Sequence, residues 1–254
     1  MLNDLQLENF LDNSELKSLL EDLITVIEIP LSIETLDNRI LLGQPSPSYT
    51  EAYPIKVQQK TIGWVKGESQ AQIIAQLLTY LANQERRVFF DDLTQIPNRR
   101  YFNRYFQQEW GRSQRQNQPL SLLLCDLDYF KFYNDYYGHQ RGDTCLQQVA
   151  QMLQEVLKRR TDLAFRYGGE EFAIILPNTE SAGAQILAEQ LVQRIRQQEI
   201  PHYVSPIKSY VTISIGIAVM VPCTEANADT LINQADLALY RAKATGRDRC
   251  CLQV

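Results

Sequence analysis

Two hydrophobic periods alternate along the last 160 or so residues of the chain. Short continuous apolar runs, which predict strands, are separated by stretches with apolar residues three and four apart, which predict helices. The strands are expected at 121–126, 172–176 and 211–221, and the helices at 144–157, 181–196 and 228–244. Because strands and helices follow one another, we expect helices packed against one central sheet, an α/β (α+β) fold.

The first 69 residues have a different pattern. A stripe at helical spacing predicts a helix over 2–27, which Pro30 ends: Leu16, Leu19, Leu20, Leu23 and Ile27. Residues 31–67 contain short β-like segments between turn residues, clearest at 40–42 and 62–65. A helix–strands–helix unit of this size resembles a small PAS- or GAF-type sensory module, which we expect to span residues 1–69.

Residues 70–90 predict a connecting helix between this unit and the rest of the chain. Ile74, Leu81 and Val88 lie seven residues apart and Leu77 occupies the intervening position, as in a coiled coil, although Gln84 interrupts the pattern. One interpretation is a helix that pairs two copies of the chain. The other is an amphipathic helix packed on its own domain.

Composition narrows the function classes. The chain has 254 residues, 44% of them hydrophobic, and a net charge of −5. This mild acidity argues against a general nucleic-acid or membrane-surface binder, which normally carries a basic excess. Five cysteines without a CxxC pair and only two histidines argue against zinc. No apolar run has the ~20 residues of a membrane span, and the first residues do not resemble a secretory signal, so we expect a cytoplasmic protein.

Two carboxylates stand at the end of the first strand of the second domain. Asp126 and Asp128 follow the apolar run 121–125 and are two residues apart, so they point to the same side if the strand stays extended. Carboxylates at the end of a buried strand are costly unless they are neutralised, and a hard divalent cation such as Mg²⁺ can do this. Ordinary solvation or helix capping is the alternative interpretation.

A glycine pair carries the second set of carboxylates. Gly168 and Gly169 lie between two β-prone runs and predict a tight hairpin turn with positive φ. Glu170 and Glu171 follow at once. A turn without Cβ atoms lets a bulky ligand approach the backbone closely, beside two acidic side chains.

The motif Arg166-Tyr-Gly-Gly-Glu-Glu-Phe172 resembles the signature turn of the GGDEF family of diguanylate cyclases. The resemblance extends from Asp91 to Arg249 and includes five motifs in order. Besides the turn, these are Asp91-Asp-Leu-Thr-Gln-Ile-Pro-Asn-Arg-Arg100, with Gln95 where glycine is usual, Asp126-Leu-Asp-Tyr-Phe-Lys131-Phe-Tyr-Asn134 with Gly138-His-Gln-Arg-Gly-Asp143, Val211-Thr-Ile-Ser-Ile-Gly216, and Ala235-Asp-Leu-Ala-Leu-Tyr240-Arg-Ala-Lys243-Ala-Thr-Gly-Arg247. It implies a catalytic domain at 91–254 whose mostly antiparallel sheet is similar to nucleotidyl cyclase and polymerase palm domains.

The resemblance implies a metal site and a catalytic acid–base group. Asp126, Glu170 and the backbone carbonyl of Leu127 would ligate Mg²⁺, or Mn²⁺, with Glu171 as a further ligand. Glu170 would also accept the proton of the attacking 3′-hydroxyl, with Lys131 assisting at the phosphates. The metal would neutralise the triphosphate as the bond to the α-phosphate breaks.

The resemblance also implies the substrate contacts. Asn134 and Asp143 would bind guanine, since a carboxylate accepts from N1–H and N2–H, and His139 would line the same pocket or pack at a helix start. Gly168 and Gly169 would let the nucleotide approach the backbone. Three cations would hold the phosphates: Lys131, Lys243 and Arg247.

A product-binding site is implied just before the turn. Arg159 and Asp162 match the RxxD inhibitory motif at which this family binds cyclic di-GMP. The second arginine that many relatives carry on the next helix aligns with Gln190, and Arg194 follows one turn later.

The implied activity is the condensation of two GTP molecules into cyclic di-GMP by a homodimer, because each catalytic domain has one GTP half-site. A non-catalytic module that binds GTP or cyclic di-GMP is the alternative. A third reading is an enzyme of the same fold that makes a mixed purine dinucleotide.

Overall fold

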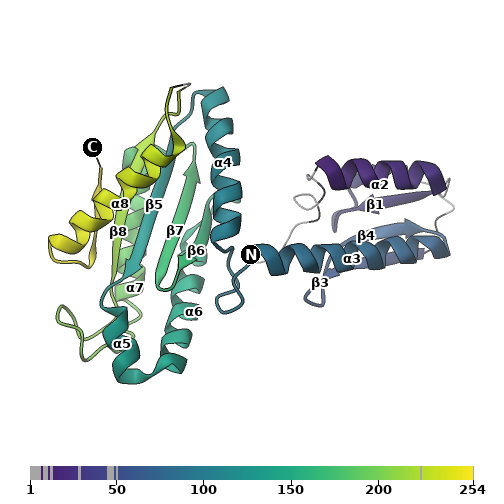
Figure 1. Cartoon of the computed structure of the whole chain (residues 1–254). Helices are drawn as coiled ribbons and strands as arrows, with labels where there is room; N and C mark the ends of the chain where they lie inside the picture. Colours follow the sequence, from purple (N-terminus) through teal and green to yellow (C-terminus); the bar gives the residue numbers. More distant parts are fainter. Residues whose placement is uncertain are drawn as a thin grey trace. The chain divides into compact units, whose positions relative to one another are not determined.

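The structure is a computed structural model. It describes residues 7, 11, 14–27, 30–44, 49, 51–223 and 225–253. The chain divides into two compact units, Met1–Val88 and Phe89–Val254, which are described separately (Figure 1).

The described residues of the N-terminal unit form a four-stranded antiparallel sheet with helices before and after it in the chain. Its elements are α2 (Ser14–Ile27), β1 (Leu31–Glu34), β2 (Ile40–Gly43), β3 (Glu51–Val57), β4 (Lys60–Gly67) and α3 (Ser69–Phe89), and the strand order is β2-β1-β4-β3. Of the helix expected over 2–27, residues 7, 11 and 14–27 are helical and the rest lie outside the described residues. The strands expected at 40–42 and 62–65 fall within β2 and β4. The likeness to a PAS or GAF module stays a prediction.

Helix α3 is attached to the edge of this sheet through polar side chains. The backbone N–H of Lys56 in β3 donates to Thr79 Oγ1 at 3.0 Å, and Asn83 Nδ2 donates to the Lys56 carbonyl at 2.8 Å. The N–H of Gln58 donates to Asn83 Oδ1 at 3.2 Å. These bonds satisfy backbone groups that an edge strand leaves unpaired, so one face of α3 belongs to its own unit.

The heptad predicted on α3 is therefore wrong at its first position. Ile74 is 4% exposed and lies in the core of the N-terminal unit with Leu78. The large apolar residues of α3 that face solvent are Ile73, Leu77, Tyr80 and Val88, at 66%, 40%, 61% and 41% exposure. Because a helix has 3.6 residues per turn, the buried and exposed stripes are neighbours that apolar spacing alone does not separate.

The C-terminal unit is built on a five-stranded sheet. Its strands are β5 (Leu120–Leu127), β6 (Leu163–Gly168), β7 (Glu171–Pro177), β8 (Ile213–Met220) and β9 (Arg249–Leu252), in the order β6-β7-β5-β8-β9. Only the pair β8 and β9 is parallel. The mixed α/β fold with a central sheet is confirmed.

Helices cover both faces of this sheet (Figure 1). They are α4 (Arg99–Gln116), α5 (Phe130–Tyr137), α6 (His139–Val156), α7 (Ser181–Arg196) and α8 (Ala228–Ala244). Leu123 and Cys125 of β5 belong to the core that contains residues of α6 and α7, whereas Leu122 and Leu124 belong to the core formed with α4 and α8. This alternation explains why β5 is apolar at successive positions: both of its faces are buried.

The observed bounds follow the predicted ones most closely where the apolar pattern is long. Helices α7 and α8 begin and end at the predicted residues. Helix α6 begins at His139 rather than 144, because its first turn is polar and carries no apolar signal. The four-residue strand β9 was not predicted, since a strand this short has too few positions to define a period.

Within the described residues, no helix combines the length and the apolar character needed to cross a membrane.

Candidate active site

The end of β5 and the glycine turn lie next to each other on the sheet. Asp126 pairs with Glu171 of β7 on one side and with Ser214 of β8 on the other. The N–H of Leu127 donates to the carbonyl of Glu170 at 3.4 Å. Residues more than 40 positions apart are thus brought together by strand register, as the motif resemblance implied.

The turn itself is tight and open to solvent. Gly168 pairs with Glu171, so Gly169 and Glu170 form its tip. Of the two glycines only Gly169 has a positive φ, +49°. A Cβ on Gly169 would meet no atom within 4 Å, and one on Gly168 would meet only Glu171 Oε2, at 3.7 Å. The turn therefore leaves room for a ligand against its backbone.

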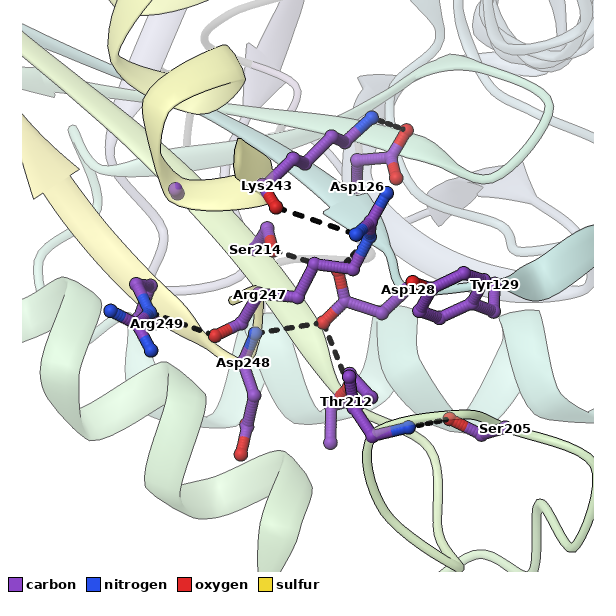
Figure 2. Close-up of polar contacts among 12 residues, drawn as sticks. Asp126, Asp128, Tyr129, Ser205, Thr212, Ser214, Lys243, Arg247, Asp248 and Arg249 are labelled. Carbon is purple, nitrogen blue, oxygen red and sulfur yellow. Dashed lines mark hydrogen bonds and ion pairs between the residues drawn. The ribbon is translucent and has the colours of Figure 1, made fainter. Parts of the chain in front are cut away.

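Asp126 is the acidic residue at this edge that is already paired. Lys243 Nζ of α8 lies 2.8 Å from Asp126 Oδ2 (Figure 2). Burial raises the pKa of Asp126, Lys243 opposes that effect, and Glu170 and Glu171 raise the pKa further. We call Asp126, Glu170, Glu171 and Lys243 the turn edge. Its surplus of carboxylate favours a bound cation.

Gly216 explains how Lys243 reaches Asp126. A Cβ at this position of β8 would lie 2.1 Å from the carbonyl oxygen of Ala235 and 2.2 Å from the backbone nitrogen of Leu239. Only glycine permits helix α8 to pack this closely on the sheet. The helix then carries Lys243, two turns beyond Ala235, to the end of β5.

The turn edge has enough carboxylates for a Mg²⁺ ion that takes only a few of its ligands from the protein. Within the described part of the chain, no three His, Cys, Asp or Glu side chains form a ready-made metal cluster. Mg²⁺ commonly takes one or two carboxylates and completes its shell with phosphate oxygens and water. Asp126 with Glu170 or Glu171 supplies that donor set.

Asp128 has a different environment from Asp126. It is 2% exposed and accepts hydrogen bonds from Thr212 Oγ1 and Ser214 Oγ, both at 2.7 Å, and from the N–H of Asp248 at 3.0 Å (Figure 2). Burial raises its pKa, and these donors oppose the rise. We call Asp128, Thr212, Ser214 and Asp248 the Asp128 network. The expectation that Asp126 and Asp128 act as a cation-neutralised pair is therefore corrected: protein donors satisfy Asp128.

Arg247 lies between the Asp128 network and the turn edge. Its Nε is 4.0 Å from Asp128 Oδ1, and its guanidinium lies 4.3 Å from the ring centroid of Tyr129. Arg196 of α7 fixes the same loop, because its Nε donates to Asp248 Oδ1 at 2.7 Å. Sequence reasoning missed Arg196 and Asp248, whose partners are remote in sequence.

One of the residues expected to bind guanine carries a buried polar atom that is unsatisfied. Asn134 Oδ1 of α5 is buried and has no hydrogen-bond partner. A Cβ on Gly142 of α6 would lie 1.8 Å from this oxygen, so the glycine makes room for the amide. His139 and Asp143 are exposed on the first turns of α6, and Lys131 is exposed on α5. A buried acceptor without a partner is costly unless a ligand donates to it.

The residues of the expected inhibitory site form an ion pair. Arg159 Nε donates to Asp162 Oδ2 at 2.9 Å, and Arg159 Nη2 donates to Thr179 Oγ1 at 2.5 Å. Asp162 Oδ1 is buried without a partner, and burial raises the pKa of this carboxyl. On α7, Arg194 forms an ion pair with Glu155 at 2.8 Å. At the expected inhibitory site, Arg159 is therefore paired with Asp162, whereas Arg194 is paired with Glu155.

Comparison with known proteins identifies the class of this fold and site. The family model for the diguanylate cyclase GGDEF domain matches residues 88–249, more than half of the chain. The chain belongs to the GGDEF family.

Two curated relatives extend the comparison. Diguanylate cyclase A of Treponema denticola is 32% identical over 269 residues, which cover 98% of this chain and 69% of that protein. A diguanylate cyclase of Vibrio cholerae is 37% identical over 162 residues, 64% of this chain and 49% of that protein. The chain thus spans about half of the Vibrio protein, whereas the match to the Treponema protein also includes the N-terminal unit.

Solved structures show the same fold. The coiled coil and GGDEF domain of DgcB from Caulobacter crescentus, in complex with c-di-GMP, matches 72% of this chain and 95% of that chain with a TM-score of 0.65 and 26% identity. The active GGEEF domain of a Vibrio cholerae diguanylate cyclase matches 62% and 97% with a TM-score of 0.55 and 34% identity.

Proposed function

We propose that this chain is a Mg²⁺-dependent diguanylate cyclase, which converts two GTP molecules into cyclic di-GMP and two pyrophosphates. The observation that carries the proposal is the pairing of Asp126 with Glu171 beside an open glycine turn. It puts carboxylates, a lysine and room for a nucleotide at one edge of the sheet. The names of the relatives support the same reaction.

The substrate would lie across the turn with its base toward α5. The amide of Asn134 and the carboxylate of Asp143 complement the donors and acceptor of guanine, and the unsatisfied Oδ1 of Asn134 gains a donor there. His139 would line the same pocket from α6. An adenine in this position would leave polar groups unpaired, which is how such a site selects its base.

The phosphates would lie against three cations from different elements. Lys131 comes from α5, Lys243 from α8, and Arg247 from the loop after α8. Lys243 has a partner in Asp126 before substrate binds, so it would exchange a carboxylate for a phosphate oxygen. Arg247 is already oriented by the Tyr129 ring.

Chemistry would take place between two half-sites. The 3′-hydroxyl oxygen of each GTP attacks the α-phosphate of the other, the α–β bond breaks, and pyrophosphate leaves with the bonding electrons. Glu170 accepts the hydroxyl proton. Asp126, the Leu127 carbonyl and Glu170, with Glu171 as a further ligand, would hold Mg²⁺ or Mn²⁺, which would neutralise the developing phosphate charge.

Two copies would be brought together through the exposed stripe of α3. Ile73, Leu77 and Tyr80 are four and three residues apart, which is the spacing of a coiled-coil seam. Because positioning dominates the reaction, contacts that orient two domains would control its rate. The N-terminal unit would supply that control, and product bound at Arg159 and Asp162 would oppose it.

The test is direct. The purified protein, freed of bound product, is incubated with GTP and Mg²⁺. The nucleotides are then separated and identified by mass spectrometry. We expect cyclic di-GMP and two equivalents of pyrophosphate. GTP that binds without turnover would refute the enzyme and favour a nucleotide-binding module. A mixed dinucleotide formed equally well from GTP and ATP would refute guanine selection.

A further inference from the structure

Arg166 lies two residues before Gly168 and contacts two turns at once. Its Nη1 donates to Asp91 Oδ1 at 2.9 Å and to Asp91 Oδ2 at 3.1 Å. Its Nε donates to the carbonyl of Gly169 at 3.1 Å. The side chains of Arg166 and Asp91 are 17% and 21% exposed, so solvent screens this pair less than a surface ion pair.

Asp91 is itself held firmly. Its Oδ1 accepts from the N–H of Thr94 at 2.8 Å and from Thr94 Oγ1 at 2.6 Å. Burial raises the pKa of Asp91, but the Thr94 bonds and Arg166 outweigh it and hold the pKa below its usual value. Asp91 is therefore an ionised, oriented partner for the guanidinium at neutral pH.

The segment around Asp91 is a closed turn that begins where α3 ends. The N–H of Asp91 donates to the Ile96 carbonyl at 2.9 Å, and the N–H of Asn98 donates to the carbonyl of Phe89, the last residue of α3, at 2.8 Å. Gln95 has a φ of +59°, the conformation that glycine favours. We call residues 89–98 the opening turn.

The backbone joins the opening turn to the strand that carries the glycine turn. The N–H of Arg166 donates to the Pro97 carbonyl at 2.8 Å, and Asn98 and Arg166 form an isolated parallel bridge. The main chain of Arg166 thus binds one end of the opening turn, and its side chain binds the other. Its third partner, Gly169, directly precedes Glu170.

The guanidinium is suited to this arrangement and lysine is not. Its planar fork donates from Nη1 and Nε in fixed, divergent directions, whereas an ammonium is a point donor on a flexible stem. Hydrogen bonds from a charged donor are stronger than neutral ones. The Gly169 carbonyl belongs to the peptide whose nitrogen is that of Glu170, so fixing this oxygen fixes the plane from which the Glu170 side chain departs.

We propose that Arg166 is a positioning residue, which locks the glycine turn to the opening turn through Asp91 and thereby sets the orientation of Glu170. It contacts no reacting atom. The inference rests on the proposed function for its kinetic consequence, but its structural consequence is independent of turnover. The opening turn would thus be a device by which the end of α3 acts on the catalytic turn.

The structural arm of the test measures backbone protection. The N–H of Leu127, at the end of β5, donates to the carbonyl of Glu170 in the glycine turn, so its hydrogen exchange reports on the order of that turn. In Arg166→Lys we expect the Leu127 amide to exchange faster than in wild type, while the amide of Leu123, in the middle of β5, is unchanged. Unchanged exchange at both amides would overturn the inference, whether or not the protein turns over GTP.

The kinetic arm separates positioning from folding. In Arg166→Lys and Asp91→Asn we expect kcat to fall by about tenfold or more, since small misplacements of reacting groups are costly, with the KM for GTP little changed. The double variant Asp91→Asn/Arg166→Lys should be no slower than the slower single variant, because both changes break one clamp.

Arg99→Gln is the matched control. The Arg99 guanidinium lies 4.5 Å from the ring centroid of Tyr167, the residue after Arg166, so the change removes a neighbouring cation and should leave kcat unaltered. A lowered melting temperature in Arg166→Lys, with kcat and Leu127 exchange as in wild type, would show that the Arg166–Asp91 ion pair only stabilises the fold. That result would overturn the proposal. An inactive wild type with faster Leu127 exchange in Arg166→Lys would refute the proposed reaction and leave the clamp standing.

Discussion

The turn edge and the Asp128 network begin two residues apart on the chain, yet they are built in opposite ways. Asp128 is enclosed by donors from β8 and the loop after α8, and both of its oxygens are satisfied. Asp126 has one lysine partner and two acidic neighbours that raise its pKa. A carboxylate saturated by protein donors supports the fold, whereas one with unbalanced charge around it is available to a cation and its ligand.

The largest effect that would sharpen this contrast is expected at Glu170. Glu170→Gln keeps the side chain's size and removes its charge, so the group can neither ligate a metal as an anion nor accept the hydroxyl proton. We expect the rate of cyclic di-GMP formation to fall at least about a hundredfold, measured from initial rates at saturating GTP. Glu180→Gln, at the start of α7, serves as the control and should retain wild-type rates. A Glu170→Gln enzyme with full activity would contradict the site assignment.

The two aspartates themselves provide the next comparison. Asp128→Ala leaves the buried hydroxyls of Thr212 and Ser214 without their acceptor, and we expect it to cost about 3 kcal/mol in the free energy of unfolding. Asp126→Asn should change that free energy little while it abolishes activity. Chemical denaturation and the cyclase assay on both variants measure the two quantities. Equal stability losses would remove the distinction between the two regions.

A moderate effect is expected at the base pocket. Asn134→Ala removes the amide whose oxygen is unsatisfied in the structure, so the KM for GTP should rise by about tenfold or more and the stability should not fall. Steady-state kinetics with GTP, and with ATP as competitor, follow the change. If stability fell and KM did not change, Asn134 would be a packing residue.

The smallest effect on the uninhibited enzyme is expected at Arg159. Its side chain is 49% exposed, so Arg159→Ala should cost less than about 1 kcal/mol of stability. Initial rates without product should equal those of wild type, while the inhibition constant for added cyclic di-GMP should rise. Because Gln190 replaces a second arginine, the inhibition of wild type is expected to be weak at the outset. Arg194→Ala is the control, since Arg194 is held by Glu155.

The features that could be predicted from the sequence are those set by residues close together along the chain. The long apolar patterns of α7 and α8 gave the correct bounds, and the motif around Gly168 led to the family. The strand β3 was not predicted as one element, because Pro54 normally interrupts a strand and is tolerated here only at the sheet edge.

The roles of single side chains required partners distant in sequence. Asp126 and Asp128 look alike as two carboxylates after an apolar run. They differ because the hydroxyl groups of Thr212 and Ser214, more than 80 residues away, donate their hydrogen bonds to Asp128. In the same way, Ile73 and Ile74 can each begin a run of apolar residues at coiled-coil spacing. The fold of the N-terminal unit decides which of the two is buried.

In the proposed reaction, one chain carries only half of an active site. This is tested most directly by co-expressing wild type with a differently tagged Asp126→Asn chain at increasing ratios and measuring cyclic di-GMP formation per wild-type chain. We expect this specific activity to fall in proportion to the wild-type fraction, because a wild-type half-site facing a defective one forms no product. A specific activity that stays constant as the defective chain is added would show that each chain works alone and would contradict this expectation.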